Sequence, residues 1–322
     1  MSDQLMESYE AVVIGGGPAG LNGAMVLARS RRSVLVIDAC APRNRPAQGV
    51  HGLLGQDGIP PTELIERGQA EVRRYGGQIA IGQVSAVAPR EQGFIVALDD
   101  GRTVRAQRLL VSSGLVDELP SIPGVRERWG RDVLHCPYCH GWEVRDQAIG
   151  VLASGPMSSH QALLFRQLSD DVAYFTHTMP PSREQAEQLA ARGIRLIDGE
   201  VTSLDIEHDR LNGVWLRDGT VVPRRALVVA PRMVAQGGFL ADLGLKATEH
   251  PSGLGEHIPA DPAGSTEVAG VWVAGNVTDL KAQVGASAAA GAFAAAQINA
   301  DLVAEEARQA LDANRSRSSS AS

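Results

Sequence analysis

Short, almost wholly apolar runs recur along the chain, and several end at a glycine or an acidic residue. Such runs, bounded by turn signals, are typical of strands buried on both faces of a parallel sheet. Longer segments with helical spacing lie between them, and this alternation predicts an α/β fold. The expected strands are Glu10–Ile14, Ser33–Ile37, Leu109–Val111, Ala148–Leu152, Val172–Thr176, Leu227–Ala230 and Gly270–Ala274, and the main expected helices are Leu21–Arg29, Pro61–Tyr75, His160–Leu168, Gln185–Arg192 and Val284–Leu302.

The first strand runs into a glycine-rich turn and then a helix, in the pattern G-x-G-x-x-G. In this arrangement, backbone N–H groups and the helix N-terminus receive a pyrophosphate. The second strand ends in an acidic residue, which can accept hydrogen bonds from a ribose hydroxyl. The order of these features predicts a dinucleotide site, with the candidate residues Gly15, Gly17, Pro18, Ala19, Gly20 and Asp38.

The composition narrows the class of protein. The chain has 322 residues, which is enough for two domains, and its net charge of -7 argues against a nucleic-acid partner. No apolar run is long enough for a membrane span, and the polar Met1–Glu10 lacks a secretory signal pattern. We therefore expect a cytoplasmic protein without a membrane partner. Three cysteines are too few for a disulfide scaffold, so a paired cysteine motif is expected to be chemical.

Cys136 and Cys139 form such a C-x-x-C motif, flanked by His135 and His140. Two thiols at this spacing can close a small disulfide ring, and a neighbouring cation favours the reactive thiolate. The same letters match c-type haem attachment and one half of a zinc site. The remaining histidines and Cys40 show no second ligand spacing, so we expect no metal site.

Further candidate residues lie in loops. The segment after the second strand is long and irregular, which is typical of a functional connection. A second strand-turn-helix occurs at Ala148–Leu168, but its turn, Ala153–Ser158, lacks the first glycine of the motif. The last expected strand also ends in a glycine, ahead of an Ala-rich helix. From these loops the candidate cofactor contacts are Asn44, His51, Gly114, Gly275, Asn276, Gln283 and Val284.

Taken together, these motifs resemble the low-molecular-weight thioredoxin reductases, a family of FAD-dependent disulfide oxidoreductases. The resemblance implies two Rossmann-like, three-layer ββα nucleotide-binding domains, the second inserted in the first. It places an FAD domain at 1–118 and 244–310 and an NAD(P)-binding-like domain with the C-x-x-C at 119–243. The polar, Ser- and Arg-rich end of the chain predicts a disordered tail at 311–322. The resemblance also implies that Cys139 faces the flavin and that Cys136 forms the mixed disulfide with substrate. The apolar helices around the flavin domain lead us to expect a homodimer.

Four departures from that family bear on function. His140 stands where the family has an acidic residue, and Asn276 replaces an aspartate. Ala153–Ser158 replaces a glycine-rich NADPH fingerprint, and His177-Thr178 replaces an arginine pair. FAD is thus the expected cofactor, and NADPH is a second one whose site departs from the family's sequence.

The Cys-x-x-Cys-His-Gly pattern is similar to a branch that includes the dithiol oxidases of gliotoxin and holomycin biosynthesis. It implies oxidation of a small-molecule dithiol to a disulfide, with O₂ as acceptor and His140, aided by His135, as acid and base. The alternative is an NADPH-dependent reductase of a thioredoxin-like protein. A haem- or zinc-binding module is the more distant alternative.

Overall fold

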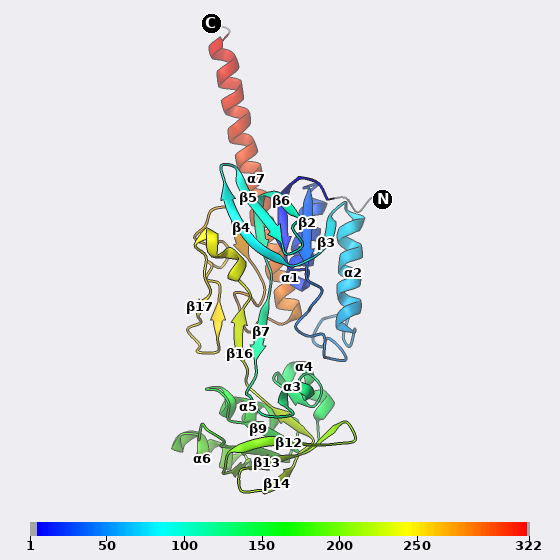
Figure 1. The fold of residues 1–322 in the computed structure, drawn as a ribbon, viewed down its shortest axis with the longest axis vertical. Coiled ribbons are helices and arrows are strands. Elements are labelled where there is room, and N and C mark those ends of the chain that lie inside the picture. Colours follow the sequence, from blue (N-terminus) through cyan, green and yellow to red (C-terminus); the bar gives the residue numbers. More distant parts are fainter. Residues whose placement is uncertain (1–4, 321–322) are drawn as a thin grey trace.

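The computed structural model describes residues 5–320, which form two bodies joined by a pair of extended segments (Figure 1). The upper body is built from both ends of the chain, and the lower body from its middle. Both are mixed α/β units with a parallel sheet at the centre. The predicted α/β class with two Rossmann-like domains is therefore confirmed.

The first body contains a seven-stranded sheet in the order β3-β2-β1-β6-β5-β4, with β19 also beside β6. β1, β2, β3, β6 and β19 are parallel, whereas β4, β5 and the first half of β6 form an antiparallel meander. The strands are β1 (Ser8–Ile14), β2 (Val34–Asp38), β3 (Gln78–Ile81), β4 (Val84–Arg90), β5 (Gly93–Leu98), β6 (Thr103–Val111) and β19 (Val271–Val273).

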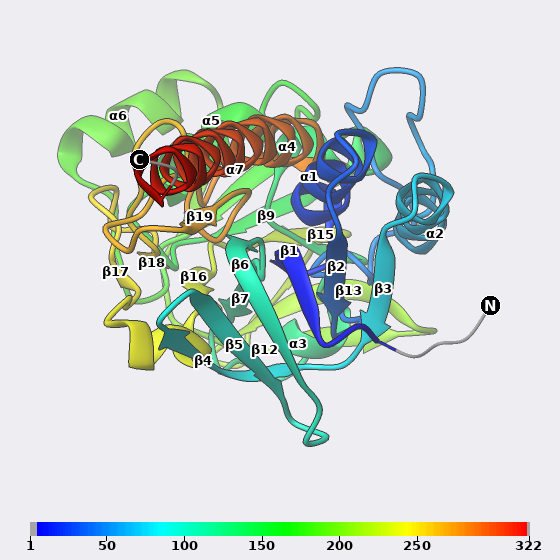
Figure 2. The ribbon, with the colours of Figure 1, turned by 90° about the horizontal axis from the view of Figure 1, so that it is seen from above.

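Alternate residues of the central strands enter two different cores, which explains why these strands are apolar throughout. In β1, Ala11 and Val13 face a core shared with the helices, whereas Val12 and Ile14 face the meander. The helices α1 (Pro18–Arg29), α2 (Pro61–Arg74) and α7 (Val284–Ser320) lie along the helical side (Figure 2). The layers are thus meander, sheet and helices, which is the expected ββα arrangement.

The second body repeats this plan at smaller size. Its parallel sheet has the order β11-β10-β9-β15-β8, with a separate meander of β12, β13 and β14. The short helices α3 (Val125–Arg128) and α4 (Pro137–His140) precede the sheet's central strand. The remaining elements are β8 (Val133–Leu134), β9 (Ile149–Leu152), α5 (Ser158–Phe165), β10 (Val172–Phe175), α6 (Arg183–Ala191), β11 (Arg195–Ile197), β12 (Val201–Glu207), β13 (Arg210–Leu216), β14 (Val221–Pro223) and β15 (Ala226–Val228), with a 3₁₀ turn, η1, at Trp142–Val144.

Two antiparallel strands, β7 (Leu115–Glu118) and β16 (Arg232–Ala235), connect the bodies. The chain leaves the first body along β7. Its return is earlier than the expected residue 244, because the 3₁₀ segment η2 (Gly238–Leu243) packs Leu240 into the core of the first body. The short hairpin β17 (Thr248–Glu249) and β18 (Glu256–His257) follows it.

Helix α7 corrects the expectation of a disordered tail. It continues to Ser320, so residues 311–320 are helical, while residues 321 and 322 lie outside the described part. Residues 303–311 are mostly alanine, glutamate, arginine and other residues that favour helix, whereas the serines, Asp312 and Asn314 that follow have lower helix propensity. Among the described residues, no helix combines the length and hydropathy that a bilayer crossing requires.

The contact between α1 and α7 gives a first testable prediction. A Cβ added at Gly291 would lie 1.9 Å from the Ala19 carbonyl oxygen, so Gly291→Ala has to push the two helices apart. We expect the free energy of unfolding to fall by about 1–3 kcal/mol, as measured by denaturant titration. Gly285→Ala, in the same helix, is the matched control because its Cβ would meet only Leu53, at 4.0 Å. Equal stability of the two variants would contradict the prediction.

Candidate active site

A cavity of about 1430 Å³ lies between the two bodies and carries most of the residues singled out from the sequence. Its walls include the first glycine loop, the C-x-x-C segment and the start of α7. The structure therefore brings together candidate residues from three distant parts of the chain. The predicted residues that line this cavity are Gly15, Gly17, Pro18, Ala19, Asp38, Asn44, His51, Gly114, His135, Cys136, Cys139, His140, Gly275, Asn276, Gln283 and Val284.

The three glycines of the first loop meet different surroundings. Gly15 has a φ of +106°, and a Cβ there would lie 2.3 Å from the Ser112 carbonyl oxygen. A Cβ at Gly20 would lie 1.9 Å from the carbonyl oxygen of Gly15, so this glycine lets the helix approach the strand. A Cβ at Gly17 would meet nothing within 4 Å, because this residue borders the cavity.

Asp38 lies at the end of β2 beside this loop. Its Oδ1 accepts a hydrogen bond from the backbone N–H of Gly16 at 3.2 Å. The carboxylate therefore supports the turn while it borders the cavity. This position suits a group that also accepts hydrogen bonds from a ribose.

The opposite wall is built where β6 and β19 end. Gly114 and Gly275 have φ values of +74° and +83°, which favour glycine. A Cβ at Gly114 would lie 3.4 Å from Oδ1 of Asn276, and a Cβ at Gly275 would lie 2.9 Å from the Cβ of Ala19. The two ends of the chain therefore meet closely around one loop-lined space.

The cysteine pair forms a disulfide whose Cα atoms are 5.3 Å apart. Cys136 immediately precedes α4, and Gly141 follows that helix because a Cβ there would lie 2.2 Å from the Pro137 carbonyl oxygen and 2.3 Å from Leu168. The Gln283 amide nitrogen, from the other body, lies 3.6 Å from the Cys136 sulfur. The sulfur that contacts Gln283 is thus Cys136, whereas the family resemblance gives Cys139 the flavin-facing role.

The two histidines beside the disulfide differ in their surroundings. Nδ1 of His135 lies 3.2 Å from the Val229 carbonyl oxygen and 3.1 Å from the Gln161 amide nitrogen, so its ring is held in place. Nε2 of His140 is buried and has no hydrogen-bond partner among the described residues. Burial lowers the pKa of both imidazoles. His140 thus has a buried ring nitrogen without a partner among the described residues, whereas Nδ1 of His135 has two contacts.

His51 links the first body to the thiol segment, a connection that we did not predict. Its Nδ1 lies 3.3 Å from Asp57 and its Nε2 lies 3.4 Å from Glu143, which follows the C-x-x-C motif. Asp57 also accepts a hydrogen bond from the Gly52 N–H at 2.9 Å. Asp57 and Glu143 were not among the candidate residues, because nothing in their spacing relates them to the cysteines.

The loop between β9 and α5 of the second body corresponds to the first glycine loop, but its backbone amides contact a side chain of the protein. The Ser158 hydroxyl is buried and accepts hydrogen bonds from the backbone N–H groups of Ser154 at 3.2 Å and Gly155 at 3.1 Å. His177, at the end of β10, accepts the Val201 N–H at 3.0 Å through Nδ1. The Ser158 side chain thus occupies two of the loop amides, and a backbone N–H occupies Nδ1 of His177.

Two dinucleotide-type domains that share a cavity with a redox-capable disulfide define a class of disulfide oxidoreductase. The chain belongs to the pyridine nucleotide-disulphide oxidoreductase family, whose model matches residues 9–296. This family binds FAD and has NADPH-dependent members. The open face of Gly17, the Asp38 carboxylate and the size of the cavity fit a bound FAD. Among the described residues, no three histidine, cysteine, aspartate or glutamate side chains gather as metal ligands.

Relatives of similar length include the thioredoxin reductase sirT of Leptosphaeria maculans, which is 28% identical over 90% of this chain and 93% of that protein. The thioredoxin reductase tcpT of Claviceps purpurea is 29% identical over 91% and 95%. The solved structure of HlmI is 44% identical with a TM-score of 0.90, covering 96% of this chain and 97% of that one. An oxidoreductase from Agrobacterium tumefaciens is 34% identical with a TM-score of 0.86, over 92% and 99%.

Serine variants of the two cysteines test which sulfur faces the flavin. A lone thiolate next to an oxidised flavin gives a long-wavelength charge-transfer band, whereas a more distant thiolate does not. If Cys139 is the flavin-facing sulfur, Cys136→Ser shows this band and Cys139→Ser lacks it. Absorption spectra of the two purified variants decide the question, and the reverse pattern would assign the flavin-facing role to Cys136.

Proposed function

We propose that this thioredoxin reductase-like FAD enzyme is a dithiol oxidase, which converts a small-molecule dithiol to its disulfide and passes the electrons to O₂. The observation that carries the proposal is the Ser158 hydroxyl on the amides of Ser154 and Gly155. In a dinucleotide site such amides are donors for the pyrophosphate. Their use by a side chain of the protein itself argues against NADPH as the electron source.

The reaction balances as R(SH)₂ plus O₂ giving the cyclic disulfide RS₂ plus H₂O₂. A substrate thiolate attacks Cys136, which breaks the Cys136–Cys139 bond and forms a mixed disulfide. The second substrate sulfur then attacks the first, which releases the product disulfide and leaves both cysteines reduced. FAD held by the first glycine loop and Asp38 would supply the two-electron acceptor for the reduced cysteines, with O₂ as the final acceptor.

His140 is the proposed base for this exchange. Its buried Nε2 is unpartnered among the described residues, and burial lowers its pKa below the ordinary value of 6.5. The imidazole is therefore neutral near pH 7 and able to accept the proton of a substrate thiol. His135, held by Val229 and Gln161, positions the segment, and Gln283 contacts the sulfur of Cys136.

An NADPH-dependent reductase of a thioredoxin-like protein is the second candidate, because relatives such as sirT and tcpT carry the name thioredoxin reductase. The two candidates share the cysteines and the flavin and differ in the source of electrons. They also differ in whether flavin reduction has to pass through the disulfide.

Anaerobic reduction separates the two candidates. The oxidised holoenzyme is mixed with dithiothreitol or with NADPH in a stopped-flow instrument, and bleaching of the flavin absorbance is followed. A dithiol oxidase is bleached rapidly by dithiothreitol and only slowly by NADPH. Rapid bleaching by NADPH would overturn the proposal.

Cys136→Ser provides the matched control for this measurement. Electrons from a dithiol have to pass through the cysteine pair, so the variant loses bleaching by dithiothreitol. Electrons from NADPH reach a flavin directly, so a reductase keeps its bleaching by NADPH in the same variant. Retained bleaching by dithiothreitol in Cys136→Ser would contradict the route through the disulfide.

The depressed pKa of His140 predicts a pH dependence. The base is active in its neutral form, so the rate of reduction by dithiol is retained above this pKa and falls as the pH drops through it, below 6.5. His140→Gln should slow reduction by dithiol by about 10²–10⁴-fold and abolish the fall in rate at low pH, with FAD still bound. The control, His135→Gln, should keep the fall in rate at low pH. An unchanged rate profile in His140→Gln would exclude this residue as the base.

A further inference from the structure

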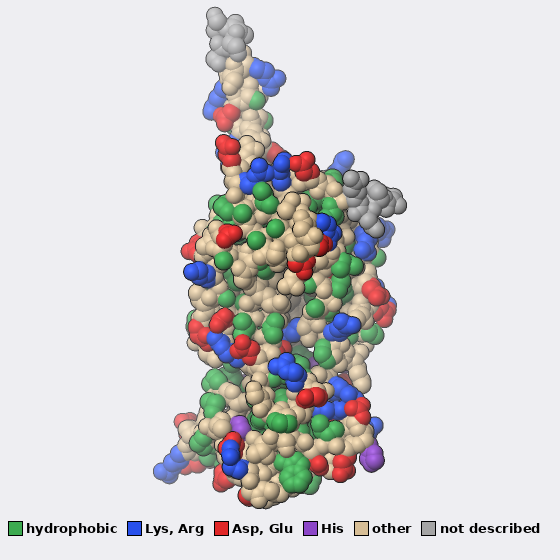
Figure 3. Space-filling model, in the orientation of Figure 1, with side chains coloured by type: hydrophobic (Ala, Val, Ile, Leu, Met, Phe, Trp, Pro, Cys, Tyr) green, Lys and Arg blue, Asp and Glu red, His purple; other side chains and the backbone are tan. Residues whose placement is uncertain are grey.

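The two bodies have separate hydrophobic cores. Two buried clusters draw only on residues 5–111 and 235–302, and two others draw only on residues 119–229. On the face drawn in Figure 3, charged side chains of both signs lie where the bodies meet. Because the described residues of the two bodies share no apolar core, the arrangement of the bodies depends on individual contacts between them.

The long loop between β2 and α2, residues 39–60, supplies several of these contacts, and we call it the clamp loop. Its end is closed by two backbone hydrogen bonds of 2.8 Å, from the N–H of Val50 to the Ile59 carbonyl and from the N–H of Gly58 to the Val50 carbonyl. The side chains of Val50 and Ile59 are buried. The clamp loop is therefore a folded element, which can hold another part of the molecule in place.

Two contacts of the clamp loop lie near the connecting strands. Arg43 donates two hydrogen bonds of 2.7 Å to the carboxylate of Asp117 on β7, and the Asp117 side chain is only 7% exposed. Pro46 packs on Gly130 of the second body, where an added Cβ would lie 2.6 Å from the Pro46 Cβ. A two-point ion pair at a largely buried carboxylate and a close backbone contact thus anchor the start of the clamp loop at the junction.

The third contact lies beside the disulfide. Nε2 of His51 lies 3.4 Å from the Glu143 carboxylate, and Nδ1 of the same ring lies 3.3 Å from Asp57 of the clamp loop. Glu143 is held close to the cysteines by the turn that ends α4, in which the Gly141 N–H donates to the Pro137 carbonyl at 2.9 Å. A displacement of Glu143 relative to His51 would therefore displace the disulfide relative to the first body.

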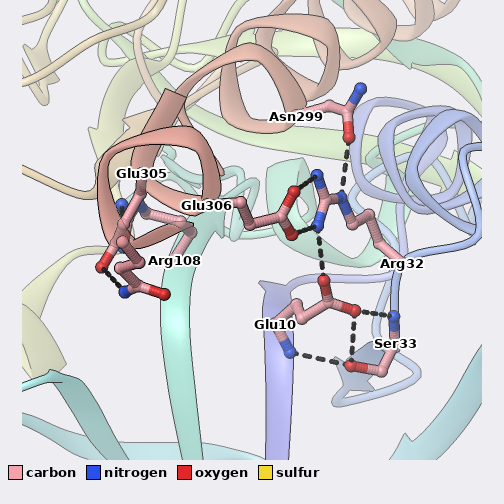
Figure 4. Close-up of polar contacts among 8 residues, drawn as sticks. Glu10, Arg32, Ser33, Arg108, Asn299, Glu305 and Glu306 are labelled. Atoms are coloured by element: carbon pink, nitrogen blue, oxygen red, sulfur yellow. Dashed lines mark hydrogen bonds and ion pairs between the residues drawn. The ribbon is translucent and has the colours of Figure 1, made fainter. Parts of the chain in front are cut away.

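The start of α7 is a second element of the first body that meets the disulfide segment. Arg32 binds Glu306 and Arg108 binds Glu305, so the middle of α7 is tied to the first body (Figure 4). Gln283 immediately precedes the first residue of this helix, and its amide nitrogen lies 3.6 Å from the first sulfur of the cysteine pair. The disulfide segment is thus contacted by two elements of the first body, the start of α7 and the clamp loop.

We propose that the clamp loop positions the disulfide segment against the first body, with His51 and Glu143 as the contact that closes the clamp. His51 is then a positioning residue, which acts on Cys136 and Cys139 through Glu143. The closed clamp keeps the disulfide at the cavity that fits FAD and limits access to its sulfurs from solvent. This role goes beyond the proposed function, because it holds for electron flow in either direction between the cysteines and the cofactor.

Alkylation of the cysteines tests the clamp without relying on turnover. The holoenzyme is fully reduced under argon, the reductant is removed, and the reaction of Cys136 and Cys139 with iodoacetamide is followed by mass spectrometry. His51→Ala and Glu143→Ala each remove the closing contact, so each should speed alkylation by about twofold to fivefold, the range for one partly exposed ion pair. The double variant should be no faster than either single variant, because both substitutions remove the same contact.

Glu63→Ala is the matched control for this measurement. The Glu63 side chain is 45% exposed, close to the 42% of Glu143, but it pairs with Arg67 within α2. This variant should be alkylated at the wild-type rate. FAD content is measured for every variant, and Glu143→Ala is decisive because Glu143 is not among the described residues that line the cavity.

Bleaching of the flavin by dithiothreitol gives a readout that a general loss of stability does not produce. At saturating dithiothreitol the rate is limited by transfer from the cysteines to the flavin, which depends on their position, so both single variants should be about twofold to fivefold slower. At low dithiothreitol the rate is limited by attack on Cys136, which should be at least as fast as in the wild type. Equal slowing at low and high dithiothreitol would contradict the positioning role.

Two further outcomes of the alkylation measurement would overturn the proposal. Single variants that are alkylated at the wild-type rate would show that the contact between His51 and Glu143 does not hold the segment. A double variant whose acceleration is the product of the two single effects would show that the residues act independently, and not through one contact.

Discussion

The backbone contact between α1 and α7 is the constraint on which the rest of the structure depends. Gly291 lies so close to the Ala19 carbonyl that no side chain fits between them, and Gly275 is similarly close to the Ala19 side chain. Ala19 belongs to the first glycine loop, and the start of α7 carries Gln283. One close approach therefore joins the two ends of the chain, shapes the dinucleotide loop and places an amide against the disulfide of the other body.

The two bodies show how one topology supports different chemistry. Both have a strand, a tight loop and a helix in the same order, with a meander on the far face of the sheet. In the first body the loop residue Gly17 borders the cavity. In the second, Ser158 reaches back onto the loop amides. The fold places a helix N-terminus at both positions, and local side chains decide whether it is free to bind a dinucleotide.

The apolar runs were sufficient to predict most central strands, because a strand buried on both faces has to be apolar throughout. The candidate residues of the first glycine loop and the C-x-x-C motif follow from local patterns, and most of them line one cavity in the structure. Contacts between distant segments could not be predicted from the sequence. Nothing local relates Glu143 to His51, and the hydrogen bonds of Ser158 depend on how the loop folds back. The return boundary was placed too late because Leu240 joins the first body only through tertiary packing.

Helix α7 was predicted to end too early for a related reason. Its expected end at Leu302 is the last position buried by the body, and the sequence beyond it is polar enough to resemble a tail. Along its length the helix meets two different physical demands. Its first turns need small residues to approach α1, and its middle needs acidic residues for Arg32 and Arg108. Neither demand extends beyond Glu306, so the pattern of the last turns carries no signal of where the helix ends.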